Sequence, residues 1–319
     1  MGRYLLRRLA IAIPSLLGIS LVLFVILALA PGDPFSELAT NPDIPASVAV
    51  HLRAQFGLDD PIWLRYLHWL AAMLHGDWGF SFASRVDVSR LILERLPTTL
   101  FVIGSSQVVA LFIALPIGIL AAVKPYSLFD QIASTSAFIG FSLPTFFTGL
   151  LFILLFSIDL GWLPFVYRAD LGVAGWQWVW QEFRQAVMPV AVLALFQGAS
   201  WMRYVRAAVL DVIHLDHVTT ARAKGLSERV VVAKHVVRNA LAPIVTIVAL
   251  QMPAVFGGAI VTEQIFRVPG IGSLLISAIL ANDTPVIMAV SFVFACLVIV
   301  FNVVADLLYG WLDPRIAYR

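Results

Sequence analysis

Six stretches of this chain, each about twenty residues long, contain no Asp, Glu, Lys, Arg or His. A helix of that length rises about 1.5 Å per residue and so crosses the roughly 30 Å hydrocarbon core of a bilayer. Because a helix satisfies its own backbone hydrogen bonds in lipid, the pattern predicts an all-α integral membrane protein with six transmembrane helices. The stretches are Leu9 to Ala30, Thr98 to Val123, Gln131 to Ser157, Ala186 to Met202, Ala240 to Thr262, and Val286 to Ala305.

Composition and net charge agree with this class. Hydrophobic residues make up 61% of the 319 positions and the mean hydropathy is +0.92, far above the values of a soluble domain. The net charge of +2 is too small to favour binding to nucleic acid. The one cysteine, Cys296, excludes an internal disulfide, and we expect it to be a small buried apolar side chain.

The first uncharged stretch has two interpretations. Three arginines precede it and Ala28-Leu29-Ala30 is similar to a signal-peptidase cleavage site. The stretch is longer than the roughly 7 to 15 apolar residues of a signal peptide, so a retained transmembrane helix is favoured.

The positions of lysine and arginine predict the orientation, because these residues accumulate in the short loops on the cytoplasmic side of the membrane. With a cytoplasmic N-terminus, the short outer loops hold only Arg168, Arg184 and Arg267. Both termini are then cytoplasmic. The basic residues placed inside are Arg3, Arg7, Arg8, Lys124, Arg203, Arg206, Arg222, Lys224, Arg229, Lys234, Arg238, Arg315 and Arg319.

The sequence predicts three consecutive parts of the chain. Residues 1–30 form the cytoplasmic end and first span, 31–97 form an extracytoplasmic cap segment, and 98–319 form a five-helix core with a cytoplasmic loop at about 203–239. Within the cap we expect a helix with Asp60 as its cap, Pro61 in its first turn, and Gly76 closing it in a left-handed conformation.

Four polar side chains lie deep within the predicted spans. Hydrogen bonds between helices are the simpler interpretation, and contact with a transported substrate is the alternative. The four are Gln107, Gln197, Gln251 and Asn302.

Several classes of function lack the motifs they require. No Gly is followed by Lys, which excludes a Walker A loop, and there is no HExxH zinc motif. The uncharged stretches offer no ionisable group for ion coupling, and no histidine for a catalytic dyad. We therefore predict no catalytic, metal or cofactor site in this chain, and an energy source that lies in a partner.

The basic stretch from Thr219 to Pro243 is the best candidate for binding that partner. Asp216 to Lys224 is predicted to be a short helix, Gly225 its end, and Ser227 the cap of a second helix. An ordinary basic loop is the alternative, but two short helices that meet at a glycine favour a docking site. Its predicted residues are Thr219, Thr220, Ala221, Arg222, Ala223, Lys224, Gly225, Leu226, Ser227 and Glu228.

This stretch, TTARAKGLSERVVVAKHVVRNALAP, resembles the cytoplasmic coupling loop of bacterial ABC importer permeases of the dipeptide/oligopeptide/nickel family, in particular the first permease subunit. Of the general EAA-loop pattern it keeps Ala221 and Gly225, and ARAKG is the variant that this subfamily shows. The similarity extends along the whole chain. Further matching segments are GRYLLRRLAIAIPSLLGIS, LAPGDP, FGLDDP, GDWGFS, ERLPTTL, VTEQIFRVPGIGSLL and DLLYGWLDPRI.

The resemblance implies a type I ABC importer permease fold in the bacterial cytoplasmic (inner) membrane. It also implies a second homologous permease, two ATP-binding subunits that hold ATP and magnesium, and an extracytoplasmic substrate-binding protein. The chain itself would then be no enzyme. Peptides are the expected substrate, nickel and glutathione are alternatives, and a non-conducting membrane assembly subunit is a different class that stays open.

Overall fold

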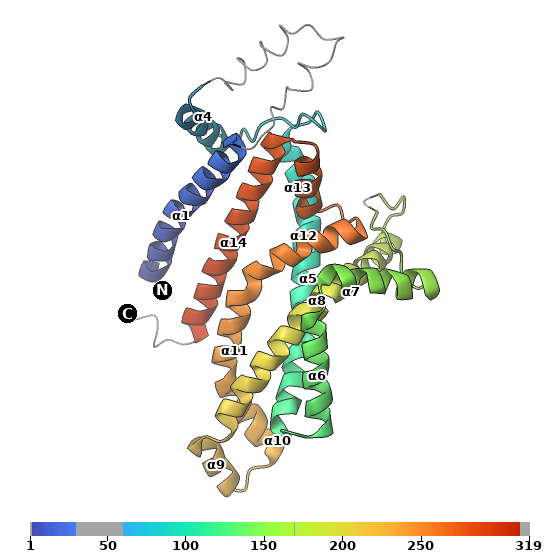
Figure 1. Ribbon diagram of the computed structural model, residues 1–319. Coiled ribbons are helices and arrows are strands. Elements are labelled where there is room, and N and C mark those ends of the chain that lie inside the picture. The colour runs from blue at the N-terminus through green and yellow to red at the C-terminus, as the bar shows by residue number, and fades with distance from the viewer. Residues whose placement is uncertain (1, 30–59, 169, 313–319) are drawn as a thin grey trace.

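The computed structural model describes residues 2–29, 60–168 and 170–312, and these are almost entirely helical (Figure 1). Apart from one isolated bridge between Phe80 and Asp87, the described residues form no β-structure. Among the described residues, five helical segments are long and apolar enough to cross a membrane, and the number is six if one bent pair is counted as a single span. The LAPGDP and FGLDDP motifs fall wholly or largely outside the described residues, as do the last seven positions.

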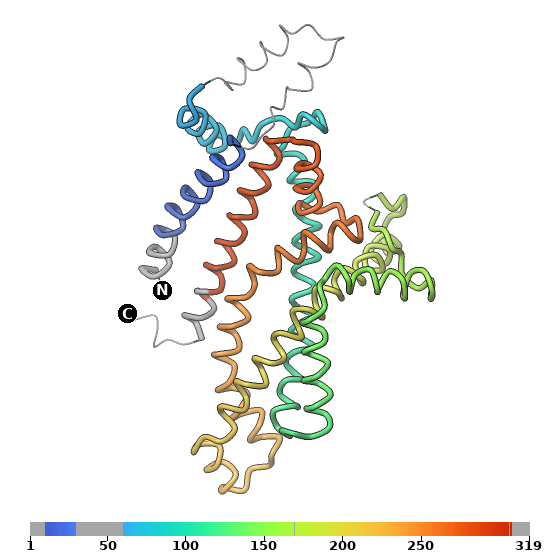
Figure 2. The backbone as a smooth tube through the Cα atoms, viewed as in Figure 1, coloured from blue at the N-terminus to red at the C-terminus, as the bar shows by residue number. Residues whose placement is uncertain are grey.

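The first and last long helices lie side by side. Helix α1 (Gly2–Leu29) and helix α14 (Thr284–Leu312) run in opposite directions, so that the start of α1 and the end of α14 point the same way (Figures 1 and 2). Helix α4 (Ile62–Leu74) packs across the far end of α1. There the Tyr66 and Ser20 hydroxyls are 3.0 Å apart, and Trp69 contacts Phe24 and Phe292.

The expectations for α4 are partly confirmed. A helix is present and Gly76 has a φ of 86°. The prediction that Asp60 caps it was wrong, because Pro61 occupies the N-cap position and no side chain makes a capping bond. Pro61, expected in the first turn, stands one position earlier, and its carbonyl oxygen accepts from the Leu64 and Arg65 N–H groups.

Two long helices form the centre of the protein. Helix α5 (Val88–Val123) and helix α8 (Trp176–Ile213) run in parallel and meet through small residues. A Cβ on Gly118 would lie 2.7 Å from Val205, and one on Gly198 would lie 3.4 Å from the Ala110 carbonyl oxygen. Helix α5 extends past its uncharged stretch at its start, and α8 does so at both ends, because helical residues outside the hydrocarbon tolerate charge.

The span predicted from Gln131 to Ser157 is not one continuous helix. Helix α6 (Leu128–Ser142) meets helix α7 (Thr145–Phe152) at an angle of 102°, and π-helix η1 (Ile153–Asp159) continues α7 outward as a lateral arm (Figure 2). Pro144 explains the break, because the residue before a proline is disfavoured in helical conformation. Gly149 lets α7 pack closely against α12. A Cβ at this glycine would lie 3.3 Å from Ile265 Cγ2.

The remaining elements form the loop and the last part of the core. Helices α9 (Asp216–Ala223) and α10 (Glu228–Val230) make up the predicted helix-glycine-helix unit. The chain then continues through π-helix η2 (Val231–Val237), α11 (Arg238–Gln251), 3-10 helix η3 (Met252–Ala254) and α12 (Val255–Phe266) as one interrupted span. Helix α13 (Ile271–Leu280) is too short to cross a membrane.

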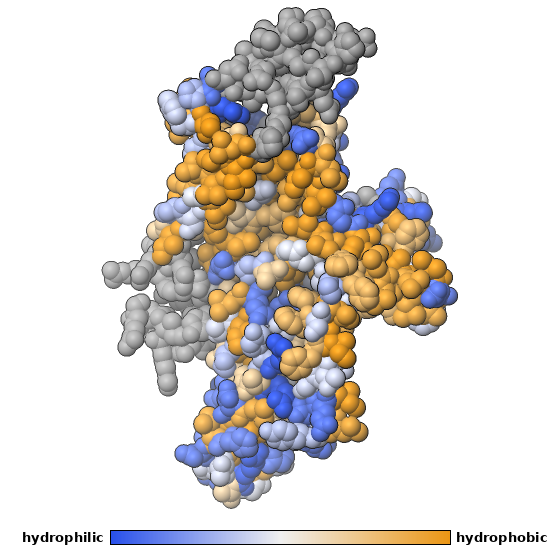
Figure 3. Space-filling view, viewed as in Figure 1, coloured by the Kyte–Doolittle hydropathy of each residue, from blue (hydrophilic) through white to orange (hydrophobic). Residues whose placement is uncertain are grey.

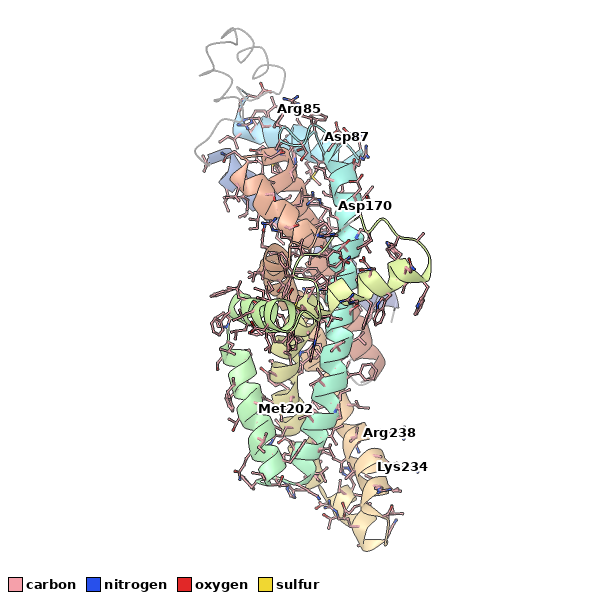
Figure 4. All side chains as sticks on the ribbon, turned by 90° about the vertical axis from the view of Figure 1, so that its right-hand side faces the viewer. Arg85, Asp87, Asp170, Met202, Lys234 and Arg238 are labelled. Atoms are coloured by element: carbon pink, nitrogen blue, oxygen red, sulfur yellow. The ribbon has the colours of Figure 1, made fainter. Side chains whose placement is uncertain are left out.

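The molecule therefore has two distinct ends. We call residues 60–87 and 267–283 the cap end, and residues 124–127 and 214–239 the loop end. Hydrophobic side chains dominate the surface of the upper half and of the arm, whereas hydrophilic side chains are mixed into the loop end (Figure 3). Figure 4 shows Arg85 and Asp87 at the cap end, and Lys234 and Arg238 at the loop end.

Candidate docking loop

The predicted hinge of the loop has the backbone geometry that glycine favours. Gly225 follows α9 with a φ of 79°, and no atom lies within 4 Å of where its Cβ would be. Its N–H donates to the Arg222 carbonyl oxygen at 2.9 Å, and the Leu226 N–H donates to the Ala221 carbonyl oxygen at 3.4 Å. The expected left-handed turn after the first short helix is confirmed.

Nearly the whole predicted docking segment faces outward. From Thr219 to Glu228, every residue is exposed except Ala221, which is 4% exposed. Ala221 packs in a cluster with Val218 and Val231 of the loop and with Val209 and Ile213 of α8. The loop thus has one apolar side packed on α8 and one largely polar side that is exposed.

Side-chain hydrogen bonds stabilise the exposed side of the loop. The Arg222 guanidinium donates to the Glu228 carboxylate across the turn, with Nε 2.8 Å from Oε1. Asn239 Nδ2 donates to the His235 carbonyl oxygen at 2.6 Å and lies 3.2 Å from His217 Nε2. Ser227 occupies the predicted N-cap position, but its side chain makes no capping bond. Its carbonyl oxygen accepts instead from the Val230 and Val231 N–H groups.

The polar residues of the spans are in three different environments. Gln197 Nε2 on α8 donates to Gln251 Oε1 on α11 at 3.2 Å, as expected for hydrogen bonding between helices. Gln107 is buried on α5, and neither amide atom has a hydrogen-bond partner among the described residues. Asn302 is exposed on α14. Contact of any of them with a substrate stays a prediction.

Sequence reasoning missed a buried carboxylate near the cap end. Glu263 of α12 is 1% exposed and accepts from the Thr99 hydroxyl of α5 at 2.6 Å and from the Ser273 N–H of α13 at 2.9 Å. The Thr99 hydroxyl oxygen also accepts from the Ile271 N–H at 2.9 Å. A carboxylate therefore caps the first turn of α13, where the helix dipole favours negative charge.

Glycine is required beside this carboxylate. A Cβ on Gly270 would lie 2.1 Å from Glu263 Oε1, and one on Gly272 would lie 2.8 Å from Oε2. The sequence segment VTEQIFRVPGIGSLL therefore brings together an acid and two glycines that depend on each other. In the sequence, the feature that could have indicated this site is an acidic residue a few positions before a Pro-Gly pair and an apolar helix.

Two more buried polar groups join neighbouring elements. Asp283 Oδ2 accepts from the Ser81 hydroxyl at 2.5 Å and from the Ala83 N–H at 3.2 Å, while its Oδ1 has no partner among the described residues. The buried Tyr167 hydroxyl donates to Glu182. Burial and this neighbouring carboxylate raise the pKa of the Tyr167 phenol far above its usual range.

The described residues contain no group of three or more His, Cys, Asp or Glu side chains that could hold a metal ion. The carboxylates of the cap end are instead occupied by hydroxyl and backbone donors from neighbouring elements. Their arrangement binds helices to each other, and it offers no reaction chemistry.

Family models identify the class of protein. Residues 1–103 match the N-terminal model of the binding-protein-dependent transport system membrane components, and residues 114–318 match the model of the inner membrane component itself. The chain belongs to this family: it is a multi-pass inner membrane component of a binding-protein-dependent transport system.

Individual relatives match along their full length. The chain is 41% identical to the oligopeptide transport system permease protein AppB of Bacillus subtilis, with all of both chains covered. It is 38% identical to the glutathione transport system permease protein GsiC of Salmonella typhi and 37% identical to that of Escherichia coli K12, again with full coverage.

A solved structure shows the same fold. The chain is similar to a subunit in a crystal structure of an amino acid ABC transporter with histidines, with a TM-score of 0.53 and 14% identity. The similarity covers 69% of this chain and 94% of that one. The shared part confirms the expected ABC permease fold.

Proposed function

We propose that this chain is one of two permease subunits that form the translocation path of an ATP-driven importer for peptides. Membership of the binding-protein-dependent family supports transport, and the names of the similar permeases support oligopeptides and glutathione as substrate classes. Full-length similarity argues against a membrane assembly subunit without a path.

One observation carries the mechanism. The loop end presents an exposed helix-glycine-helix unit whose inner side is packed onto α8, the longest helix in the described part of the chain. An ATP-binding subunit that docks on this unit can move α8 directly. The partners would bind ATP and magnesium, and this chain would hydrolyse nothing.

Charge supports the orientation of the two ends. Arg222, Lys224 and Arg229 are exposed at the loop end, which the distribution of basic residues places in the cytoplasm. The cap end then faces the extracytoplasmic binding protein. The first residues of α1 and the last described residues of α14 point toward the cytoplasm in this arrangement (Figure 1).

The path itself would be formed with the second permease. Transport requires contacts that are weak enough to release the substrate, and uncharged polar groups such as Gln107 meet this condition. Glutathione is the second candidate substrate, because two of the similar permeases carry that name. Nickel is a further alternative, because selectivity would lie largely in the binding protein.

Reconstitution tests the function. The purified chain alone should hydrolyse no ATP, whereas the complex with its second permease and ATP-binding subunits should hydrolyse ATP and respond to the binding protein. Proteoliposomes should accumulate labelled oligopeptide in an ATP-dependent manner, with glutathione and nickel measured in parallel. Hydrolysis by the isolated chain, or a complete complex that accumulates no candidate substrate, would contradict the proposal.

A further inference from the structure

An ion pair between a buried aspartate and a partly exposed arginine joins two helices near the loop end. The Arg206 guanidinium on α8 donates from Nε to Asp130 Oδ1 at 2.6 Å and from Nη2 to Oδ2 at 2.7 Å. The Asp130 side chain, on the first turn of α6, is 4% exposed, and that of Arg206 is 25% exposed. Two parallel charge-assisted bonds fix both distance and orientation, which a single contact does not.

Asp130 also organises the turn between α5 and α6. Its Oδ2 accepts from the Tyr126 N–H at 2.8 Å and its Oδ1 accepts from the Ser134 hydroxyl at 3.2 Å. Its own N–H donates to Ser127 Oγ at 3.2 Å. The carboxylate therefore joins α8 to the whole turn as well as to α6.

Helix α6 depends on few other buried contacts. Within α6, Asp130 and Ala137 are the buried residues. Farther along, Arg203 lies 5.1 Å from the ring centres of Phe138 and Phe141, and Phe141 stacks on Phe196 of α8. Apolar and aromatic contacts like these can slide, so the ion pair is what sets the position of the first turn of α6.

The same part of α8 also belongs to the apolar cluster that includes the docking loop. Val205 and Val209, one on each side of Arg206 along α8, belong to the apolar cluster that holds Val218, Ala221 and Val231 of the loop. The cluster also includes Ala137 of α6. A displacement of the loop therefore reaches α8 and the middle of α6 by packing, and it reaches the first turn of α6 through the ion pair.

We propose that Asp130 and Arg206 form a strut that makes α6 and α8 move as one body when the docking loop is displaced. The pair is then a positioning element for transport, and it carries movement to α6 and its lateral arm. The inference rests on the proposed function of the loop. Stability alone is a weak reason for such a pair, because burying two charges offsets most of the gain from their attraction.

The test uses the assembled complex and separates coupling from folding. Asp130→Asn with Arg206→Gln removes both charges together and leaves no unpaired charge buried. We expect the variant complex to retain its ATP-binding subunits and to hydrolyse ATP, while substrate taken up per ATP hydrolysed falls roughly 3- to 30-fold. A matched control neutralises the exposed pair Arg90 and Glu94, which should leave this ratio unchanged.

A reversible cross-link supplies a readout that a purely structural role would not change. A Cβ on Gly140 of α6 would lie 3.4 Å from the Ala199 Cβ of α8, close to the separation in a disulfide. In a Cys296→Ala background, Gly140→Cys with Ala199→Cys should leave uptake intact after oxidation. In the neutralised variant, oxidation should restore uptake per ATP and reduction should remove it again.

Each outcome decides the proposal. Unchanged coupling in the neutralised variant overturns the strut, as does a cross-link that blocks uptake in the chain with the intact pair or fails to rescue the neutralised one. An unaltered complex that shows neither ATP hydrolysis nor uptake overturns the proposed function, and the strut with it. Wild-type activity combined with normal coupling in the variant overturns the strut alone.

Discussion

The cap end and the docking loop are held in place by different means. At the cap end and the adjoining parts of α5 and α12, buried Ser81, Thr99, Glu263 and Asp283 join segments that lie far apart in the sequence, with hydroxyl and backbone N–H groups as donors. At the loop end, apolar packing holds the docking loop on α8, and the loop's own polar contacts lie at the surface.

The difference has a physical consequence for each end. Buried polar contacts are costly to break, because each partner would be left without a hydrogen bond in a medium that offers no replacement. Exposed contacts exchange with water or with a partner at little cost. We therefore expect the cap end to act as a fixed scaffold and the loop end to be open for exchange with the ATP-binding subunits.

The largest expected effect is all-or-none labelling, which tests that the ends lie on opposite sides of the membrane. In a Cys296→Ala background, Ser227→Cys should react with an impermeant thiol reagent only from the cytoplasmic side, because the loop end carries the exposed basic residues. Asp170→Cys, beyond the arm, should react only from outside. The reverse pattern would overturn the orientation and the docking proposal together.

The next effect concerns the rigidity of the cap end. Gly270→Ala places a methyl group where the Glu263 carboxylate lies, so α13 must shift and the capping bonds must break. We expect a loss of about 3 kcal/mol or more in unfolding free energy, measured by thermal unfolding in detergent.

Gly257→Ala is the matched control for that substitution, since a Cβ there meets no atom within 4 Å. It should leave stability unchanged or slightly increased, because alanine favours helix. Equal stability of the two variants would show that the cap end tolerates movement of α13, and the comparison between the ends would lose its basis.

A smaller effect tests the open loop end. Gly225→Val forces a β-branched residue into a left-handed conformation at a local cost of roughly 1 to 3 kcal/mol. We expect normal membrane insertion but weaker retention of the ATP-binding subunits, with ATP hydrolysis and uptake lowered together. Gly225→Ala should be milder, and Gly225→Asn milder still, because asparagine adopts this conformation more readily.

Gly172→Val is the control that tests whether backbone strain outside the docking loop has the same effect. Gly172 has a φ of 61° and equally open surroundings, but it lies between η1 and α8, away from the docking loop. It should not affect subunit retention. If Gly225→Val assembles and transports normally, or if Gly172→Val impairs docking equally, the loop has no special mechanical role.

The smallest effect concerns the exposed pair of the loop. A double-mutant cycle of Arg222→Ala and Glu228→Ala should give a coupling energy of about 0.2 to 1 kcal/mol that decreases with added salt. Thermal unfolding of the four proteins at low and high ionic strength provides the measurement. A larger, salt-independent value would mean that the loop is braced as firmly as the cap end.

The regular features of the fold could be predicted from the sequence. The apolar stretches, the cap helix, the two short helices of the loop and the left-handed Gly225 were all predicted and are present. Each depends on residues that are close in the chain: a run of apolar side chains, or a glycine after a short helix. Local patterns of this kind determine local structure.

The sequence could not predict which distant polar groups meet. Thr99 and Glu263 are separated by 164 positions, and Asp130 and Arg206 by 76, so neither contact leaves a periodic signal. The break at Pro144 was also missed, because a proline within a long apolar stretch is compatible with a kinked span or with two helices. Contacts of α7 with α12 decide between them.

By itself, then, the sequence determined that this chain enters the membrane and how many times it can cross, and it predicted where a partner would dock. Those properties follow from local hydrophobicity, charge and backbone freedom. The tertiary structure decided which polar groups are buried and paired, and so which helices are fixed to each other. That outcome depends on three-dimensional proximity, since a carboxylate is stable in the interior only where donors from other elements reach it.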